Sequence, residues 1–277
     1  MTSFAINHMT APKASFEELL VLAQHCGCMG GELRNELVSS PMVGCLNASE
    51  SAAEVKVCAK SSVLEIVALA EVANFNHFTE QTRKAARKLC EQASRCGAQG
   101  IVLIPANDAS NPSLSTRKSQ LSRAFSELLP ILEYYDLCAF VEPLGFDSST
   151  LRYKSEVVEQ IEAMSLSSRF KLVHDTFHHH LAGEQEYFAA HTGVVHVSGV
   201  IDTELKPSQM KDCHRVLVNE QDQLNTVHQL AILATDGYQG PISMEVFAPC
   251  VHELPNLAEE LRDSYDFINS GLAAMVA

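Results

Sequence analysis

Short apolar runs alternate with longer amphipathic segments along the chain, at a repeat of about 30 residues that is typical of strand–helix units. The apolar runs predict strands at Phe4–His8, Gly30–Arg34, Val63–Leu69, Ile101–Pro105, Cys138–Glu142, Lys171–Asp175, Val194–Ser198 and Ile242–Phe247. The intervening spacing predicts helices at Phe16–His25, Ser51–Ala59, Glu80–Cys96, Ser115–Tyr135, Lys154–Ala163, Asn225–Thr235 and Leu257–Asn269. Ser15 and Glu18 have the spacing of a capping box at the start of the first helix.

Eight strands that alternate with helices in a chain of 277 residues favour an α/β fold, the (β/α)8 TIM barrel. The structural alternative is a doubly wound sheet, which usually has a glycine-rich phosphate loop after its first strand. The chain contains neither GxGxxG nor GxxxxGK[ST], and no linker rich in Pro or Gly divides it. We therefore expect a single barrel domain over residues 1–277.

Composition narrows the range of partners. Hydrophobic residues make up 46% of the chain and charged residues 19%, as in a globular protein with a sizeable core. The net charge of −14, from 34 acidic and 20 basic residues, disfavours nucleic acid and anionic membranes as partners. A small molecule is the expected partner, and the composition leaves assembly into a homo-oligomer open.

Cysteine usage and the first residues bear on the compartment. The nine cysteines form no CxxC pair, and most lie in apolar or helical surroundings, which favours reduced thiols and a cytoplasmic location. The opening MTSFAINHMTAP lacks the basic and apolar regions of a signal peptide, and no run approaches the roughly 18 apolar residues of a membrane span.

Acidic residues and histidines stand at the ends of the last four predicted strands. Glu142 lies in CAFVEPLG, Asp175 in KLVHDTF, His196 in GVVHVSGV and Glu245 in GPISMEVF. The carboxyl ends of barrel strands meet at one mouth, so these side chains become neighbours. Each residue alone is more typical of a salt bridge or a buried hydrogen bond, but a buried carboxylate must be paired or metal-bound. Together they predict a site for one divalent ion, Mn, Co, Zn or Mg.

Other polar residues near these ends receive weaker interpretations. His178 follows Asp175 by three positions and is expected to face a substrate oxygen rather than the metal. His179 and His180 are interpreted as loop or surface residues. Glu32 and Arg34 end the second strand and are expected to pair with each other.

The second half of the chain resembles the xylose-isomerase-like superfamily of TIM barrels, in particular its sugar isomerase and epimerase branch and, within it, the 2-keto-myo-inositol (inosose) isomerases. The resemblance covers about residues 138–250 and is carried by the segments VEPLGF, HDTFHHH, VVHVSGV, HRVLV and ISMEVFAP.

The resemblance implies a role for each matching residue. The metal ligands would be Glu142, Asp175, His196 and Glu245, with His178 and Arg215 in contact with the substrate. Glu142 and Glu245 would also act as acid and base on opposite faces of the bound sugar. For Arg215, a salt bridge at the base of a loop is the alternative.

The implied activity is divalent-metal-dependent isomerisation or epimerisation of a keto-sugar or keto-cyclitol through a metal-stabilised enediolate. Two departures leave the substrate open: Ser148 stands where epimerases of the branch tend to have a Glu, and VLVNEQDQLNT replaces a Pro-Gly-x-Gly turn after Arg215. The main alternative is a metal-dependent dehydratase of inosose or of a dehydroshikimate-like acid. A repair endonuclease would need more histidines and a basic surface, and a non-catalytic polyol binder would bind without proton exchange.

Overall fold

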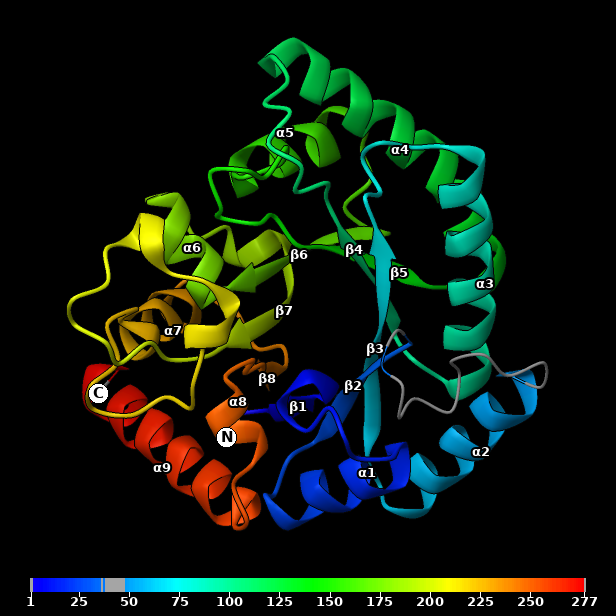
Figure 1. Ribbon diagram of the computed structural model, residues 1–277. Coiled ribbons are helices and arrows are strands. Elements are labelled where there is room, and N and C mark those ends of the chain that lie inside the picture. Colours follow the sequence, from blue (N-terminus) through cyan, green and yellow to red (C-terminus); the bar gives the residue numbers. More distant parts are fainter. Residues whose placement is uncertain (1, 36, 38–47, 277) are drawn as a thin grey trace.

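The computed structural model describes residues 2–35, 37 and 48–276 and shows eight parallel strands that close into a barrel. Each strand pairs with its neighbours in the sequence, and β1 pairs with β8 to close the ring (Figure 1). The strands are β1 (Phe4–Asn7), β2 (Gly30–Arg34), β3 (Glu65–Ala73), β4 (Gly100–Ile104), β5 (Cys138–Val141), β6 (Phe170–Asp175), β7 (Thr192–Val197) and β8 (Ile242–Met244). The predicted (β/α)8 barrel is confirmed.

Helices form a ring outside the strands (Figure 1). They are α1 (Phe16–His25), α2 (Ala48–Ser61), α3 (Glu80–Cys96), α4 (Leu114–Tyr135), α5 (Lys154–Ala163), α6 (Thr176–Ala182), α7 (Thr226–Thr235), α8 (Pro249–His252) and α9 (Leu257–Val276). The predicted capping box opens α1, because the backbone N–H of Ser15 donates to Glu18 and that of Glu18 donates to the Ser15 hydroxyl.

The third strand begins two residues later than predicted and continues further. Val63 is 89% exposed and has a positive φ of 57°, so it belongs to the turn after α2 rather than to a strand. The apolar run from Glu65 to Ala73 then forms the longest strand of the barrel.

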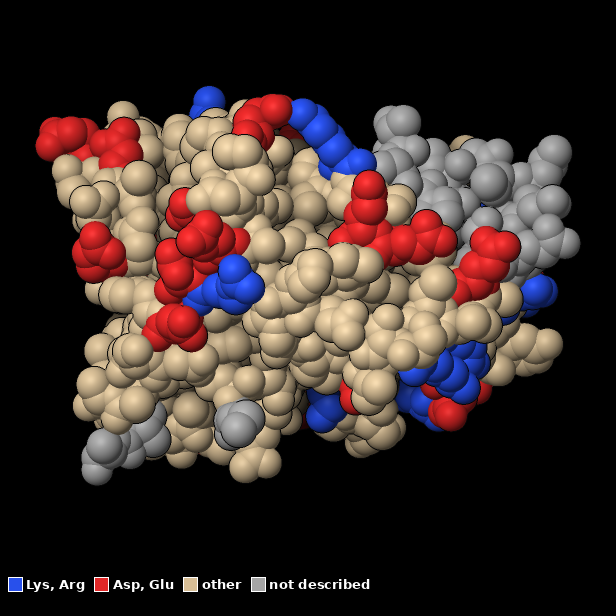
Figure 2. Space-filling view, turned by 90° about the horizontal axis from the view of Figure 1, so that it is seen from below, with Lys and Arg blue, Asp and Glu red and all other residues tan. Residues whose placement is uncertain are grey.

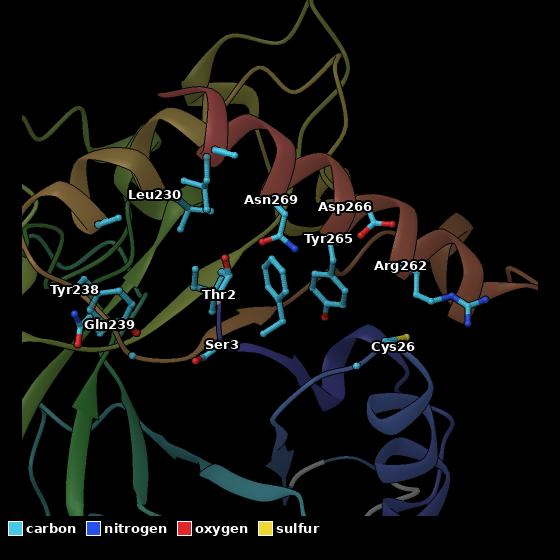
Figure 3. Close-up of a pocket in the computed structure, with 17 residues that line it drawn as sticks. Thr2, Ser3, Cys26, Leu230, Tyr238, Gln239, Arg262, Tyr265, Asp266 and Asn269 are labelled. Carbon is cyan, nitrogen blue, oxygen red and sulfur yellow. The ribbon is translucent and has the colours of Figure 1, made fainter. Parts of the chain in front are cut away.

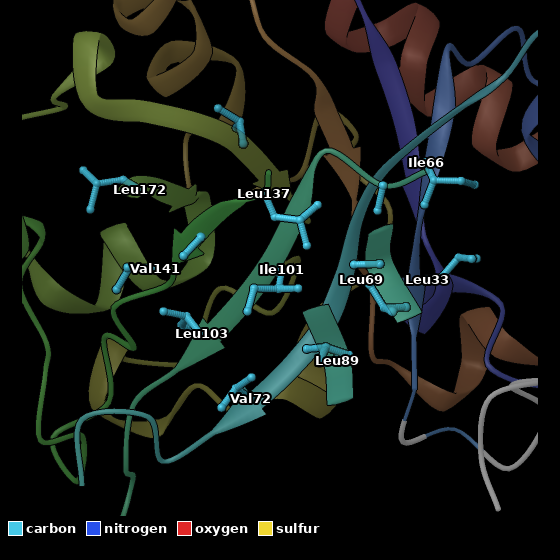
Figure 4. Close-up of a cluster of buried hydrophobic side chains, with 14 of the residues drawn as sticks. Leu33, Ile66, Leu69, Val72, Leu89, Ile101, Leu103, Leu137, Val141 and Leu172 are labelled. Atoms are coloured by element: carbon cyan, nitrogen blue, oxygen red, sulfur yellow. The ribbon is translucent and has the colours of Figure 1, made fainter. Parts of the chain in front are cut away.

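Side chains alternate between the two faces of each strand, and this alternation divides the core. Outward residues such as Leu33, Ile101 and Leu172 pack in the main cluster between the barrel and the helices (Figure 4). Inward residues such as Val102 and Phe140 form a smaller cluster with inward residues of other strands. Inward positions nearer the carboxyl ends of the strands are therefore the ones that can carry polar site residues.

The described cysteines are all free thiols, and Cys45 lies outside the described residues. Burial raises the pKa of Cys90 to about 12, which keeps this thiol protonated and inert at neutral pH. No helix in the described part of the chain is both long and apolar enough to cross a membrane. On the face shown in Figure 2, Lys and Arg side chains lie among scattered Asp and Glu side chains.

A surface pocket of about 1000 Å³ lies at the amino-terminal end of the barrel (Figure 3). Its lining includes Ser3 beside the start of β1, Ile242 at the start of β8, and Tyr265 and Asn269 of α9. This end of the barrel is opposite to the predicted metal ligands, so the pocket is separate from the candidate site.

Candidate metal centre

The four predicted metal ligands meet inside the carboxyl-terminal mouth of the barrel. Asp175 ends β6, His196 lies in β7, and the two strands pair these residues directly. Glu142 and Glu245 follow β5 and β8, and their backbone N–H groups still donate to the neighbouring strands, at Leu103 and Val197. The closed barrel thus places four residues that are far apart in the sequence at adjacent strand ends.

Distances within the cluster are short enough for one ion. One ligand atom from each of the four residues lies within 4.8 Å of those of the other three, and all four residues are buried. Nδ1 of His196 is 3.2 Å from Oε2 of Glu245, 3.7 Å from Oε1 of Glu142 and 4.0 Å from Oδ2 of Asp175. The imidazole therefore points its nitrogen at three carboxylates.

The cluster fits a divalent cation on chemical grounds. Three carboxylate oxygens and one imidazole nitrogen match the preferences of Mn, Co or Zn, and the carboxylates also suit Mg. Nδ1 of His196 is buried and has no hydrogen-bond partner among the described residues. A buried polar atom without a partner is costly unless a ligand satisfies it. We conclude that these residues could hold a divalent metal ion.

Asp175 also makes hydrogen bonds to the backbone at the start of α6. Its Oδ1 accepts hydrogen bonds from the backbone N–H groups of Phe177, at 2.7 Å, and His178, at 3.0 Å. The residue is therefore the N-cap of α6, while Oδ2 faces the other ligands. This cap explains why a seven-residue helix begins at this point of the chain.

Arg215 is directed at the cluster rather than at a surface loop. Its Nη2 donates to Oδ2 of Asp175 at 2.6 Å and to Oε2 of Glu245 at 3.0 Å. The guanidinium also lies over the rings of Phe177 and Phe247, and the residue is only 1% exposed. The expected alternative of a salt bridge is thus present, but inside the site.

His178 lies in the first turn of α6, at the edge of the cluster. Its Nε2 is 3.9 Å from Oε1 of Glu142, and its Nδ1 is buried without a hydrogen-bond partner in the described structure. The ring packs edge-on against Phe146 and Phe177. These contacts hold the imidazole beside the candidate metal position but outside the four-ligand set.

Glu32 and Arg34 do not pair with each other as predicted. They are two positions apart on β2, so both point into the barrel, where each contacts residues of other strands. Glu32 faces Nε2 of His196, at 3.1 and 3.2 Å from its two oxygens, while Arg34 donates to Glu71 at 2.6 Å and to Glu245 at 3.2 Å. Strand β2 therefore contributes contacts to two of the four ligands.

The two glutamates differ in their electrostatic surroundings. Burial raises the pKa of Glu142, and the nearby charge of Glu245 raises it further against the effect of His196. Burial also acts to raise the pKa of Glu245, but the positive charges of His196, Arg215 and Arg34 outweigh it and hold that pKa well below its ordinary value. Before any cation binds, Glu245 is thus the more strongly ionised of the two.

His179 is not a surface residue, in contrast to the prediction. It is 8% exposed and lies on α6 with the half-buried His180. Lys154, at the start of α5, donates to Nδ1 of His179 at 2.8 Å and to Nδ1 of His174 at 2.9 Å. His174 points outward from β6 because its neighbour Asp175 points inward. A buried cluster of Lys154 and two histidines therefore supports the junction of β6 and α6.

The ammonium of Lys154 is buried among neutral groups, with the carboxylate of Glu184 4.0 Å away. Burial lowers the pKa of Lys154 from 10.5 to about 7, and Glu184 offsets only part of this effect. The same burial lowers the pKa of His179 to about 3 and that of His174 well below its usual range, so both rings are neutral.

This lowered pKa predicts a pH-dependent stability. Between about pH 7 and the unfolded pKa of 10.5, the unfolded chain binds the Lys154 proton and the folded chain does not, so stability rises with pH. Relative to Lys154→Met, the free energy of unfolding of the wild type should rise by up to about 1.4 kcal/mol per pH unit over this range. Urea unfolding at about pH 7.5 and about pH 8.5 measures the difference.

Lys118→Met is the control, because Lys118 forms a surface pair with Glu159 and should leave the pH slope unchanged. Equal slopes for the wild type and Lys154→Met would contradict a neutral Lys154 in the folded protein.

The two departures from the family pattern have structural replacements. Ser148 donates a hydrogen bond to Asn107, in the loop after β4, at 2.6 Å. After Arg215, Asp222 accepts from the backbone N–H groups of Val200, Leu224 and Thr226 and so organises the loop. A carboxylate therefore orders this loop, which lacks the glycine turn.

The chain belongs to the xylose isomerase-like TIM barrel family, whose sequence profile matches residues 22–270. A xylose isomerase domain-containing protein from Salmonella typhimurium LT2 has a similar structure, with a TM-score of 0.84 and 29% sequence identity, over 100% of this chain and 98% of that one. No curated protein matches the chain in sequence.

Solved structures with lower sequence identity share the fold. The IOLI protein, crystallised with a bound zinc atom, has a TM-score of 0.84 at 18% identity over 99% of both chains. A D-psicose 3-epimerase from Clostridium cellulolyticum H10, solved with D-tagatose, has a TM-score of 0.75 at 14% identity over 98% of this chain and 99% of that one.

Proposed function

We propose that the protein is a divalent-metal-dependent isomerase or epimerase of a keto-sugar or keto-cyclitol of the inosose type. The observation that carries this proposal is the buried cluster of Glu142, Asp175, His196 and Glu245, whose ligand atoms lie within 4.8 Å of one another. Support also comes from the zinc bound by IOLI and from the activity named for D-psicose 3-epimerase, two proteins with the same fold.

The reaction class requires a proton to leave a carbon beside a carbonyl group. A divalent cation, when bound, polarises the carbonyl and stabilises the negative charge that develops on its oxygen. The chain must supply the groups that accept and return the proton, and carboxylates within hydrogen-bond reach perform this task in enzymes.

Glu142 and Glu245 share the proton transfers in this proposal. Among the described residues, the ion-pair partners of Glu142 are His178 and His196, so no guanidinium competes for its oxygens. Arg34 and Arg215 keep Glu245 ionised, so in this proposal Glu245 starts the reaction without a proton. His178 and Arg215 are proposed to orient substrate oxygens, because each lies beside the cluster with a donor group directed at it.

Proton exchange with solvent tests the proposal directly. The protein loaded with Mn, Zn, Co or Mg is incubated in D₂O with a panel of inososes and ketohexoses, and the products are followed by NMR and mass spectrometry. We expect deuterium at the carbon beside the carbonyl, together with an isomer of unchanged composition. Loss of water with formation of an enone would instead identify a dehydratase, and binding without any exchange would identify a polyol sensor.

A further inference from the structure

Glu32 is a fully buried carboxylate to which neither the proposed chemistry nor the family pattern assigns a task. It is 0% exposed, lies on β2 between Gly31 and Leu33, and points into the barrel. Its partner is His196, whose Nε2 is 3.2 Å from Oε2 and 3.1 Å from Oε1. An ionised carboxylate in such a place must be neutralised by a specific partner, and the imidazole N–H is the donor that faces it.

The two nitrogens of His196 have opposite surroundings. Nε2 faces the acceptor oxygens of Glu32, whereas Nδ1 faces Glu245, Glu142 and Asp175 and has no hydrogen-bond partner among the described residues. A neutral imidazole carries one proton, and only its unprotonated nitrogen can bind a metal. A carboxylate at Nε2 keeps the proton there and leaves the lone pair on Nδ1.

We propose that Glu32 is a positioning residue for the metal, whose hydrogen bond from Nε2 of His196 fixes the ring so that Nδ1 binds the cation. Residues that hold metal-binding histidines in this way orient the ring and raise its basicity, and their loss typically weakens metal binding by about 10- to 100-fold. The inference rests on the proposed metal centre but not on the identity of the substrate.

Zinc affinity is the direct test, measured by competition with a chromophoric chelator. Glu32→Ala, which removes the acceptor, should bind zinc about 100-fold more weakly, and Glu32→Gln, whose amide oxygen still accepts a hydrogen bond, about 10-fold more weakly. Glu156→Gln is the matched control, because Glu156 is also a buried carboxylate but pairs with Arg117 of α4. Circular dichroism of the metal-free variants verifies that they are folded.

A second readout reports the ring itself, independently of activity. In the zinc-loaded wild type, ¹⁵N NMR of His196 should show a proton on Nε2 and none on Nδ1. A zinc affinity of Glu32→Ala within about 3-fold of the wild type, or a ring bound through Nε2, would overturn the inference. Failure of the wild type itself to bind zinc, manganese or cobalt would instead overturn the metal centre.

Discussion

Replacing Glu245 by Gln is expected to lower turnover by at least about 100-fold, the smaller end of the effect of removing a general base. Gln keeps nearly the shape of Glu and one oxygen for a metal, but it cannot accept a proton. It also removes the charge that Arg34 and Arg215 contact at 3.2 and 3.0 Å. The rate of deuterium incorporation into a substrate identified by the exchange experiment measures the effect.

The control for this variant is Glu253→Gln. Glu253 is exposed and pairs with Lys13 at the surface, so the change should leave turnover unaffected. Both variants must be compared at saturating metal, because Glu245 is also a candidate ligand. If Glu245→Gln retained turnover within a few-fold of the wild type, the residue could not be the base.

Replacing Arg215 by Ala is expected to lower the free energy of unfolding of the metal-free protein by about 3–5 kcal/mol. The guanidinium contacts two buried carboxylates, Asp175 and Glu245, and its removal takes away the arginine partner of Asp175 and one of the cationic partners of Glu245. Arg215→Lys should lower the free energy of unfolding by less, because lysine keeps the positive charge. Some loss should remain, because lysine lacks the planar donor group. Chemical unfolding in the presence of a chelator measures both losses.

Addition of a divalent ion should recover part of this loss, because a cation bound to the same carboxylates stabilises the folded state by mass action. Arg169→Ala is the control: Arg169 pairs with Asp136 at the surface, and its loss should cost less than about 1 kcal/mol. A deficit in Arg215→Ala below about 1 kcal/mol would show that the carboxylates do not depend on Arg215.

The fold and the four-residue cluster could be predicted because both depend on one local pattern, an apolar run that forms a buried strand. An apolar run that ends in an acid places that acid at the barrel mouth, and a parallel barrel brings all such ends together. The prediction required only the strand positions, and small errors at strand ends, such as the start of β3 at Glu65, did not move Asp175 or His196.

Contacts between distant elements could not be predicted in the same way. The spacing of Glu32 and Arg34 predicts a pair, but both side chains point into the barrel and contact residues of other strands instead. Lys154 and its partners His174 and His179 come from α5, β6 and α6, and no local pattern joins them. The sequence predicts loop or surface positions for His179 and His180, whereas they lie on α6, which Asp175 caps.

The two-sided carboxylate of Asp175 has a mechanical consequence. Its Oδ1 accepts hydrogen bonds from the first turn of α6, and its Oδ2 faces Arg215 and His196. A shift of this side chain would therefore shift the start of the helix. His178 belongs to that first turn, and its ring therefore follows Asp175. The candidate metal position and the proposed substrate contact of His178 are thus linked through the first turn of α6.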